Sequence, residues 1–581
     1  MSADVAGVAP SSPAPSREGR GRFAQLSGLD AVALLLSLTL VIPIVSVCLS
    51  LFSGQSNVFV QLAETVLPEY AVNTMLLTLL VVIGVLVVGV PAAWLTAMCE
   101  FPGRRFLEAA LILPMAAPAY VLAYAYAGFL SAYGPVQIGL RAATGWETGD
   151  YWFPDIRSLP GAALMLVLTL YPYVYLLARA RFLNESASAL EAARLLGRGP
   201  WASFFAVSLP LARPALVAGA TLAAMNTLAD YGTVSYFGVP VFTTGIYNAW
   251  FSFSDQIAAR ELAAVLIGFV GLALVAEHYF RGRARFHETG RQDRRPPRYG
   301  LSGAKSAGAI IACVLPPLLG FVVPALVLIE LLIESGGPTR DFSKDLFNTL
   351  TLAGSAAVIV TLGALVLGFA RKERPGGIAA RAAAFTALGY AVPGSVIAVG
   401  VLVPFAALDN LFADFAKSAF GFSPGLVLTG GIAALLVAYT ALYLAVALQS
   451  VNAGFERITP SIQSAAKLLA RGPIDALTRV HLPLIAPSVL TAALLVFVDV
   501  MKELPATLML RPFNFDTLAI KASTYASDER LSWAASPSLA IVAVGIIPCI
   551  ILIRSITASA RRGGEAPPLP SSSFDKLRMR N

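Results

Sequence analysis

The sequence contains few charged residues. Asp, Glu, Lys and Arg make up 13% of its 581 residues, whereas soluble domains carry about 25%, which excludes an ordinary soluble protein. The four cysteines and three histidines are dispersed, with the spacing of neither a metal site nor a disulfide framework. The net charge of +8 comes from short basic segments between apolar runs, so it does not indicate a nucleic acid partner. We therefore expect this chain to bind no metal, no cofactor and no nucleic acid.

A nucleotide-binding loop of the form GxxxxGK followed by Ser or Thr is also missing. The nearest segment, Gly303-Ala304-Lys305-Ser306, lacks a glycine beside its lysine and follows no predicted strand. Because that loop is what holds the phosphates of ATP in many ATPases, we expect this chain not to hydrolyse ATP itself.

Long apolar runs dominate the sequence instead. Hydrophobic residues make up 57% of the chain, and the mean hydropathy is +0.72. Runs of about 20 apolar residues can cross a bilayer as helices, and a backbone exposed to lipid must satisfy its own hydrogen bonds. The sequence therefore predicts an all-α integral membrane protein of about 12 transmembrane helices. The candidate spans are 29–52, 71–98, 107–132, 161–181, 214–237, 262–280, 307–333, 347–370, 380–406, 425–448, 488–511 and 536–557.

Basic residues recur in every second loop between these spans. Because Arg and Lys near span ends favour the cytoplasmic side, we expect both termini and the basic loops to be cytoplasmic. The segment 281–300 is rich in Arg and Pro and has no apolar period, which indicates a connector. The predicted organisation is a disordered tail (1–28), a first six-span domain (29–280), a basic linker (281–306), a second six-span domain (307–557) and a disordered tail (558–581).

The two six-span halves carry related sequences. Asn73-Thr74 opens the second span of the first half, and Asn348-Thr349 opens the corresponding span of the second half. Pro118 and Pro393 match at the same offset. Because each half has six spans, the repeats have the same orientation and are expected to pack in parallel about an axis near the membrane normal.

Two basic loops contain the strongest repeat, at 193–214 and 466–487, where half of the positions carry the same residue. In the first copy, glycines flank Arg198 and favour a turn, after which Pro200 suits the first position of a short helix. We expect Leu209-Pro210 to end this helix, because the residue before a proline is pushed out of the α region.

The short helix of each copy would carry apolar side chains on its surface. Trp201 and Phe204 lie one turn apart in the first copy, as do Ile474 and Leu477 in the second. Such side chains on an aqueous loop fit a partner's groove. The alternative is a helix lying on the membrane surface with its arginines toward lipid headgroups. Recurrence of the stretch at matched positions favours a docking element.

These loops resemble a known motif. Glu191-Ala192-Ala193, Gly197 and Leu209-Pro210 resemble the EAA motif of permease subunits of binding-protein-dependent ABC importers. The second copy departs from it, with Ser464 in place of the Glu and Ala470 in place of the Gly. The resemblance implies the type I ABC importer permease fold, with loops that dock on an ATPase. The residues implied in this coupling are, in loop 185–213, Glu191, Ala192, Gly197, Gly199, Trp201, Phe204, Leu209 and Pro210, and, in loop 455–487, Ala465, Gly472, Ile474, Leu477, Leu482 and Pro483.

The resemblance also implies partners and a location. Two ABC ATPase subunits would dock on the cytoplasmic side and use ATP, and a periplasmic substrate-binding protein would meet outer loops such as 133–160 and 238–261. The chain would lie in the bilayer of a bacterial inner membrane. The fused layout and the segment 229–251 look most like ferric-iron permeases, although thiamine and aminoethylphosphonate permeases share the layout. An ion-coupled secondary transporter with two parallel six-span halves is the alternative of a different class.

Charged residues fall within the predicted fifth spans: Asp230 in the first half, and Asp499, Lys502 and Glu503 in the second. Each costs roughly 2.5–3.5 kcal/mol at the centre of a membrane, so each should face a partner or an aqueous path. Asp230 and Glu503 occupy equivalent positions in the two halves and are candidates for a translocation pathway. Asp499 and Lys502 are further candidates, but their spacing also permits a structural ion pair. Tyr231 is another candidate, although aromatic residues are common at membrane interfaces.

Overall fold

A computed structural model of the chain describes residues 28–562, apart from 53–55, 184–199, 282–297, 374–375, 387–388, 390 and 470–471. The described residues are helical almost throughout, as expected where apolar runs must satisfy their own backbone hydrogen bonds. An exception is a short parallel pairing of β1 (Cys99–Glu100) with β2 (Tyr299–Gly300), which joins the two segments that follow α3 and precede α14.

The helices of each half follow one another through short connections. Those of the first half are α1 (Gly28–Ser50), α2 (Asn57–Thr65), α3 (Leu67–Met98), α4 (Arg104–Ala110), η1 (Leu113–Ala116), α5 (Ala119–Leu130), α6 (Pro135–Thr144), α7 (Leu159–Leu183), α9 (Pro200–Ser203), η2 (Phe204–Ser208), α10 (Leu209–Ala229), α11 (Gly232–Tyr236), α12 (Phe242–Tyr247), η3 (Asn248–Ser252) and α13 (Gln256–Arg281). Those of the second half are α14 (Ala304–Pro317), η4 (Leu318–Val322), α15 (Val323–Glu334), α16 (Phe342–Glu373), α17 (Ile378–Thr386), α18 (Gly394–Phe420), α19 (Ala433–Glu456), α20 (Pro460–Leu469), α21 (Pro473–Ala476), η6 (Leu477–His481), α22 (Leu482–Met501), α23 (Pro505–Leu510), α24 (Leu518–Ser527) and α25 (Leu531–Arg562). Of the η segments, η1 is a 3-10 helix and η2, η3, η4 and η6 are π-helical.

The predicted all-α membrane architecture is confirmed. Within the described residues, eleven helices are long and apolar enough to cross a membrane, and a bent pair would make a twelfth. α3 shows why: its 32 residues carry one charged side chain, Glu69, and at 1.5 Å per residue it is about 48 Å long. The helix ends where Cys99 adopts an extended backbone and begins the pairing of β1.

The predicted span 107–132 is not straight, which corrects the sequence analysis. The chain bends by 92° between Arg104–Ala116 and Ala119–Thr144. Pro118 causes the break, because proline has no N–H to donate and pushes the residue before it out of the α region. Pro118 itself is extended (φ −63°, ψ 150°), and Pro393 has nearly the same backbone (φ −60°, ψ 145°) ahead of α18 in the second half.

The first helix of each half packs against the other half. α1 contacts α16, α17, α18 and α19, as well as α13 of its own half, while α14 and α15 contact α3, α4 and α5, as well as α25 of their own half. Close approaches between residues of the two halves support both sets of contacts. A Cβ added at Gly400 of α18 would lie 2.7 Å from the Pro43 Cα of α1, and one at Gly320 of η4 would lie 2.9 Å from the Leu168 carbonyl oxygen of α7. Neither half therefore forms its helix bundle from its own residues alone.

The sequence duplication is visible in matched hydrogen bonds at the start of α3 and α16. The Asn73 side chain donates to the Pro240 carbonyl at 3.0 Å, and Asn348 donates to the Asp516 carbonyl at the same distance. The neighbouring threonine hydroxyl of each helix then accepts a backbone N–H, from Phe242 in the first half and from Leu518 in the second. Each pair fixes the segment that follows a broken fifth span.

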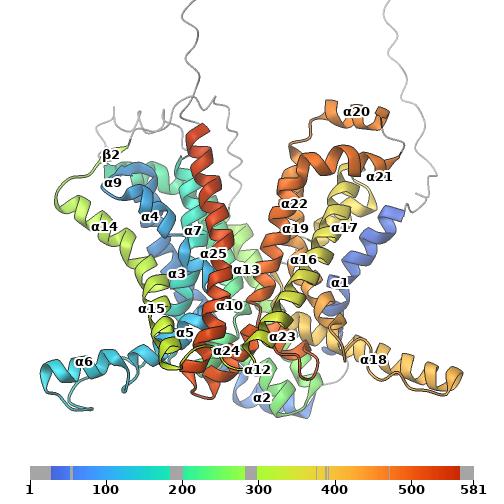
Figure 1. Ribbon diagram of the computed structural model, residues 1–581, viewed down its shortest axis with the longest axis horizontal. Helices are drawn as coiled ribbons and strands as arrows, with labels where there is room; N and C mark the ends of the chain where they lie inside the picture. The colour runs from blue at the N-terminus through green and yellow to red at the C-terminus, as the bar shows by residue number, and fades with distance from the viewer. Residues whose placement is uncertain are drawn as a thin grey trace, which may run out of the picture.

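Figure 1 shows the helices in two groups that meet near α12 and α24 and diverge toward β2 and α20. The helices of the basic loops, α4, α9, α20 and α21, lie at the diverging end, whereas α2, α6, α12 and α24 lie at the other end. The basic loops therefore share one end of the molecule.

Candidate functional site

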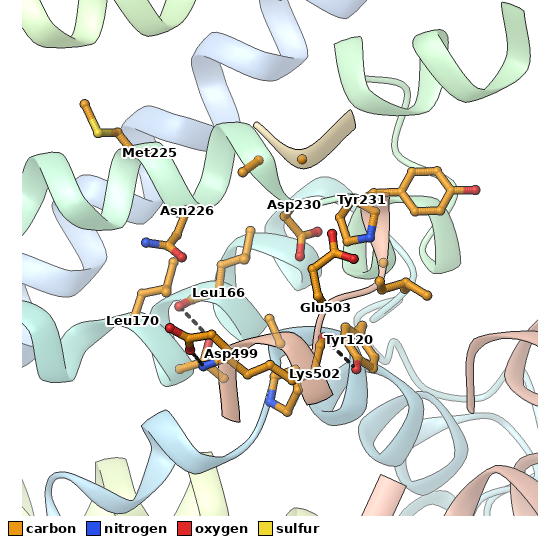
Figure 2. A pocket seen from close by; sticks show the side chains of 18 of the residues that line it. Tyr120, Leu166, Leu170, Met225, Asn226, Asp230, Tyr231, Asp499, Lys502 and Glu503 are labelled. Carbon is orange, nitrogen blue, oxygen red and sulfur yellow. Dashed lines mark hydrogen bonds and ion pairs between the residues drawn. The ribbon is translucent and has the colours of Figure 1, made fainter. Parts of the chain in front are cut away.

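A cavity of about 260 Å³ lies where four helix breaks meet, two from each half. Its wall includes the residues around Pro118, Asp230, Gly394 and Glu503, which precede or begin α5, α11, α18 and α23. Figure 2 shows side chains from both halves facing this space. Proline lies at or next to three of these breaks, and a carboxylate lies at the fourth. The breaks interrupt helices that would otherwise cross the membrane.

Asp230 holds the first turn of α11. Its Oδ1 accepts the backbone N–H groups of Thr233 and Val234 at 3.1 and 3.2 Å, and its Oδ2 accepts the Thr233 hydroxyl at 3.0 Å. These amides have no partner within the helix, so the carboxylate acts as a cap and also meets the positive end of the helix dipole.

Glu503 does the same for α23, at the same sequence offsets. Its Oε1 accepts the N–H of Ala506 at 2.6 Å, and its Oε2 accepts the N–H of Thr507 at 2.8 Å as well as the Thr507 hydroxyl. The side chain is buried, with 8% of the residue exposed. The two equivalent acids thus have equivalent capping roles, and both also line the cavity.

Asp499 and Lys502 form an ion pair of 2.9 Å on the cavity wall, the pairing that their spacing permits. Both side chains are partly exposed, at 29% and 31% respectively. The charged groups that line the cavity are therefore three carboxylates and one ammonium, which leaves a formal excess of two negative charges. Figure 2 shows the pair below Asn226 and apart from the two capping acids.

Tyr231 lines the cavity, but its ring extends away from the carboxylates in Figure 2. The ring stacks on that of Tyr247, with centroids 3.7 Å apart. The Tyr247 hydroxyl in turn donates to the Pro505 carbonyl of the second half. This candidate therefore belongs to an aromatic contact between the halves.

The sequence analysis did not single out five polar residues of the cavity wall: Tyr120, Thr169, Tyr173, Asn226 and Tyr443. Tyr120 donates to the Lys502 carbonyl at 3.2 Å, and Tyr443 donates to the Asp499 carbonyl at 3.4 Å. A signal existed for Asn226, because it matches Asp499 at the same offset that relates Asp230 to Glu503.

The predicted end of the short helix at Leu209-Pro210 is wrong. The chain stays helical from α9 through η2 into α10, and Leu209 donates its N–H to the Phe204 carbonyl, five residues back. Such a π-helical turn shifts the hydrogen-bond register, so the missing N–H of Pro210 is tolerated. The second copy has the same device, because Leu482, which precedes Pro483, donates to the Leu477 carbonyl.

Phe204 does not project into solvent, which corrects a second expectation. It is 6% exposed, and its ring centroid lies 4.9 Å from that of Trp94 and 6.3 Å from that of Phe182. The second half has a matching cluster, in which the ring centroid of His481 lies 5.5 Å from that of Phe369 and 6.2 Å from that of Phe455. These clusters join the helices of the two repeated basic loops to the ends of the spanning helices.

The remaining coupling candidates are placed as follows. Glu191, Ala192, Gly197 and Gly199 lie outside the described residues, and Trp201 is placed by its backbone in α9. In the second copy Ile474 is 72% exposed, and Ala465 and Pro483 are also exposed. Leu477 and Leu482 are half-buried against the core, and Gly472 has open space where a Cβ would lie. Of the two apolar side chains that the sequence predicts on the short helix of the second copy, Ile474 is therefore exposed and Leu477 is not.

Histidine, cysteine and carboxylate side chains are dispersed among the described residues. Within them, no three or more His, Cys, Asp or Glu side chains are grouped so that they could hold a metal ion. Cys48, Cys99, Cys313 and Cys549 are free thiols.

Comparisons with known proteins agree with this architecture. Residues 85–276 match the family model of the binding-protein-dependent transport system inner membrane component. The chain is 28% identical over 493 residues, 83% of its length, to 89% of the Fe(3+)-transport system permease protein FbpB 2 of Haemophilus influenzae. It is 30% identical over 190 residues, 32% of its length, to 79% of the molybdenum transport system permease protein ModB of Escherichia coli. The sulfate transport system permease protein CysW of Escherichia coli is 29% identical over 197 residues, which cover 34% of this chain and 65% of CysW.

Both the fold and the comparisons lead to one assignment. The helical architecture is the type I ABC importer permease fold, and multi-pass relatives of this kind reside in the inner membrane. Members of this family are transport components, not enzymes. The chain belongs to the family of binding-protein-dependent transport system inner membrane components, as the permease of an ABC importer.

Proposed function

We propose that this permease transports ferric iron through the cavity between its halves. The observation that carries the proposal is the similarity to an Fe(3+)-transport permease over both halves of the chain. The cavity lining supports it, because three carboxylates outnumber one ammonium and favour a cation. A space of about 260 Å³ is smaller than the roughly 300–1,000 Å³ of pockets for drug-sized ligands, which suits an ion or a small solute.

An oxyanion is the second candidate substrate. The match to ModB and CysW, which are named for molybdenum and sulfate transport, extends over about a third of the chain. Lys502 is the cation on the described cavity wall that could meet an anion, although Asp499 pairs with it. The excess of carboxylates makes this substrate class less favourable than a cation.

The driving force in this proposal comes from separate subunits. Two ATPase subunits would dock on loops 185–213 and 455–487, at the end of the molecule that we assign to the cytoplasm together with both termini. The exposed Ile474 supports docking in the second loop. A periplasmic binding protein would deliver substrate at the opposite end, where α12 and α24 lie. The units 29–280 and 307–557 would act as the two moving halves, with 281–306 as their linker.

Uptake measurements test the substrate. A strain that lacks this chain should lose uptake of radioactive iron and regain it with the intact chain, while molybdate, sulfate and thiamine uptake stay unchanged. Loss of molybdate uptake instead would favour the oxyanion. Uptake by the chain in vesicles without ATPase subunits would contradict the importer proposal and favour a secondary transporter.

A substitution tests the docking loop. Ile474→Glu places a charge on an exposed apolar contact, so it should reduce ATP-driven uptake and leave membrane insertion intact. Phe106→Glu is the matched control, because Phe106 is 75% exposed in α4 at the same end of the molecule, outside both repeated loops. Equal effects of the two substitutions would count against a docking role for this loop.

A further inference from the structure

Two lateral arms extend from the body of the molecule at the end opposite β2. The first arm is residues 131–158, which include α6, and the second arm is residues 405–432, which include the later part of α18. Figure 1 shows α6 and α18 leaving the body sideways at opposite edges, across the direction of the spanning helices. The arms follow the equivalent breaks at Pro118 and Pro393, so they are a repeated feature of the fold.

The second arm is a well-defined hairpin. The Asp409 side chain is fully buried and accepts the backbone N–H groups of Val427, Leu428 and Thr429 at 2.8–3.0 Å, together with the Thr429 hydroxyl. A carboxylate that satisfies three backbone donors fixes the returning segment against the helix. The exposed residues on this arm therefore belong to an ordered surface.

One face of the helix in the second arm is apolar and exposed. Leu408, Leu411, Phe412 and Phe415 recur at i, i+3, i+4 and i+7, the spacing of a single helical face, and are 41–65% exposed. Lys417 is exposed and falls on the opposite side of the helix by the 100° advance per residue. An amphipathic helix of this kind, with aromatic residues on its apolar face, is typical of the boundary between lipid headgroups and acyl chains.

The first arm also presents aromatic residues, and one of its two arginines, Arg141, is bonded within the arm. Tyr133 and Trp152 are 89% and 86% exposed. Arg141 donates to the Ala132 carbonyl at 2.7 Å and to the Tyr151 hydroxyl at 3.1 Å. Arg141 is therefore used within the arm and Arg157 pairs with Glu529 outside it, while the rings of Tyr133 and Trp152 are exposed, as aromatic rings are in the belts of membrane proteins.

The helix of the second arm packs, before the arm begins, against a candidate membrane span. α1 packs on α18 where Pro43 approaches Gly400, and exposed apolar side chains lie at the end of α1 and just after it, with Leu49 57% and Phe52 85% exposed. Leu49 belongs to an apolar helix long enough to cross a membrane, and Phe52 follows it. The arms also extend sideways, away from α23, whose first residue lines the cavity, whereas a protein that delivers substrate must sit over the cavity.

We propose that both arms lie in the lipid interface at the end opposite β2, with Leu408, Leu411, Phe412 and Phe415 among the acyl chains of a phospholipid bilayer. This placement reassigns residues 133–158 from the expected binding-protein surface to a lipid surface. Two arms at opposite edges resist tilting of the permease, because tilting would lift one arm out of the interface and press the other into it.

Nitroxide labels test the proposal in the full chain, reconstituted in vesicles of phosphatidylethanolamine and phosphatidylglycerol. Labels are attached in a Cys48→Ala background, because the other three cysteines are buried. Phe415→Cys reports the apolar face, Lys417→Cys reports the opposite face of the same helix, and Phe513→Cys is a control, because Phe513 is fully exposed in the loop between α23 and α24. Collision rates with oxygen, which partitions into lipid, and with a water-soluble nickel chelate are measured by spin resonance.

The expected result is that the label at 415 collides more with oxygen than with nickel, and that labels at 417 and 513 do the reverse. If 415 is as accessible to nickel as 513, the proposal is overturned. A second measurement places photoreactive benzoylphenylalanine at position 415 in intact cells, which changes the side chain little. A lipid adduct supports the proposal, and an adduct with a soluble protein in its place overturns it in favour of protein docking.

Discussion

Replacing the two capping acids by their amides separates a structural role from a role in transport. Asp230 and Glu503 hold equivalent short helices but use their oxygens differently. Oδ1 of Asp230 accepts both backbone N–H groups, whereas in Glu503 the two backbone N–H groups go to different oxygens, Oε1 and Oε2. An amide has one accepting oxygen, so Asp230→Asn can keep both backbone bonds. Glu503→Gln must turn its NH₂ group toward one of the two N–H groups.

The two substitutions should therefore lower the free energy of unfolding by different amounts. A buried N–H left without an acceptor costs about 1–3 kcal/mol, whereas the net loss of one ordinary hydrogen bond costs about 1 kcal/mol. We therefore expect Glu503→Gln to lower the free energy of unfolding by about 1–3 kcal/mol. Asp230→Asn should lower it by about 1 kcal/mol at most, through its altered contact with the Thr233 hydroxyl.

Thermal unfolding of the purified variants in detergent, followed by tryptophan fluorescence, measures this difference. Iron uptake by vesicles that contain the same variants with their ATPase subunits is measured in parallel. Equal unfolding temperatures, or a lower one for Asp230→Asn, would refute the assignment of these oxygens as caps. Loss of uptake in Asp230→Asn at unchanged stability would show that its charge acts on the transported ion.

Three further predictions concern packing and pH. Gly400→Ala should lower the free energy of unfolding by about 1–3 kcal/mol more than Gly354→Ala does. The reason is that a Cβ at position 400 meets Pro43, whereas nothing lies within 4 Å of a Cβ at position 354. Equal unfolding temperatures of the two variants would contradict the close contact. Phe204→Ala should cost about 3–5 kcal/mol, because the ring is buried, and a negligible shift in unfolding temperature would mean that it is exposed after all. Arg157 hydrogen-bonds Glu529 and holds the pKa of this carboxyl below its ordinary 4.5. The stabilisation is therefore complete above pH 4.5 and is lost as pH falls through the lowered pKa, a step in unfolding temperature that Glu529→Gln should remove.

The spans and the duplication could be predicted because their causes are local in the sequence. Apolar runs of sufficient length identify spanning helices, and Asn73 and Asn348 mark matched positions that make matched hydrogen bonds. The ion pair of Asp499 with Lys502 also follows from local spacing, because Lys502 directly follows the helix that carries Asp499. The capping by Asp230 and Glu503 did not follow, because it depends on where each fifth span breaks.

Other features depend on contacts that no local pattern reveals. The exchange of α1 and α14 between halves is set by close approaches such as Gly400 to Pro43, two residues from opposite halves of the sequence. The pattern Leu209-Pro210 predicts a helix end, yet the helix continues past it because η2 has π-helical hydrogen bonds. The sequence predicts that Phe204 is exposed, but Trp94 and Phe182 bury it. These two residues belong to other helices.

The exchanged first helix sets an order of events during synthesis. α1 ends at Ser50, and the first of its second-half partners, α16, begins only at Phe342. A ribosome adds roughly 5–20 residues per second, so it needs about 15–60 s to cover the roughly 300 residues between these helices. α1 must wait that long in the bilayer, which its sequence permits because it carries no charge after Asp30. Joining both halves in one polypeptide ensures that the waiting helix meets its partner in the same molecule.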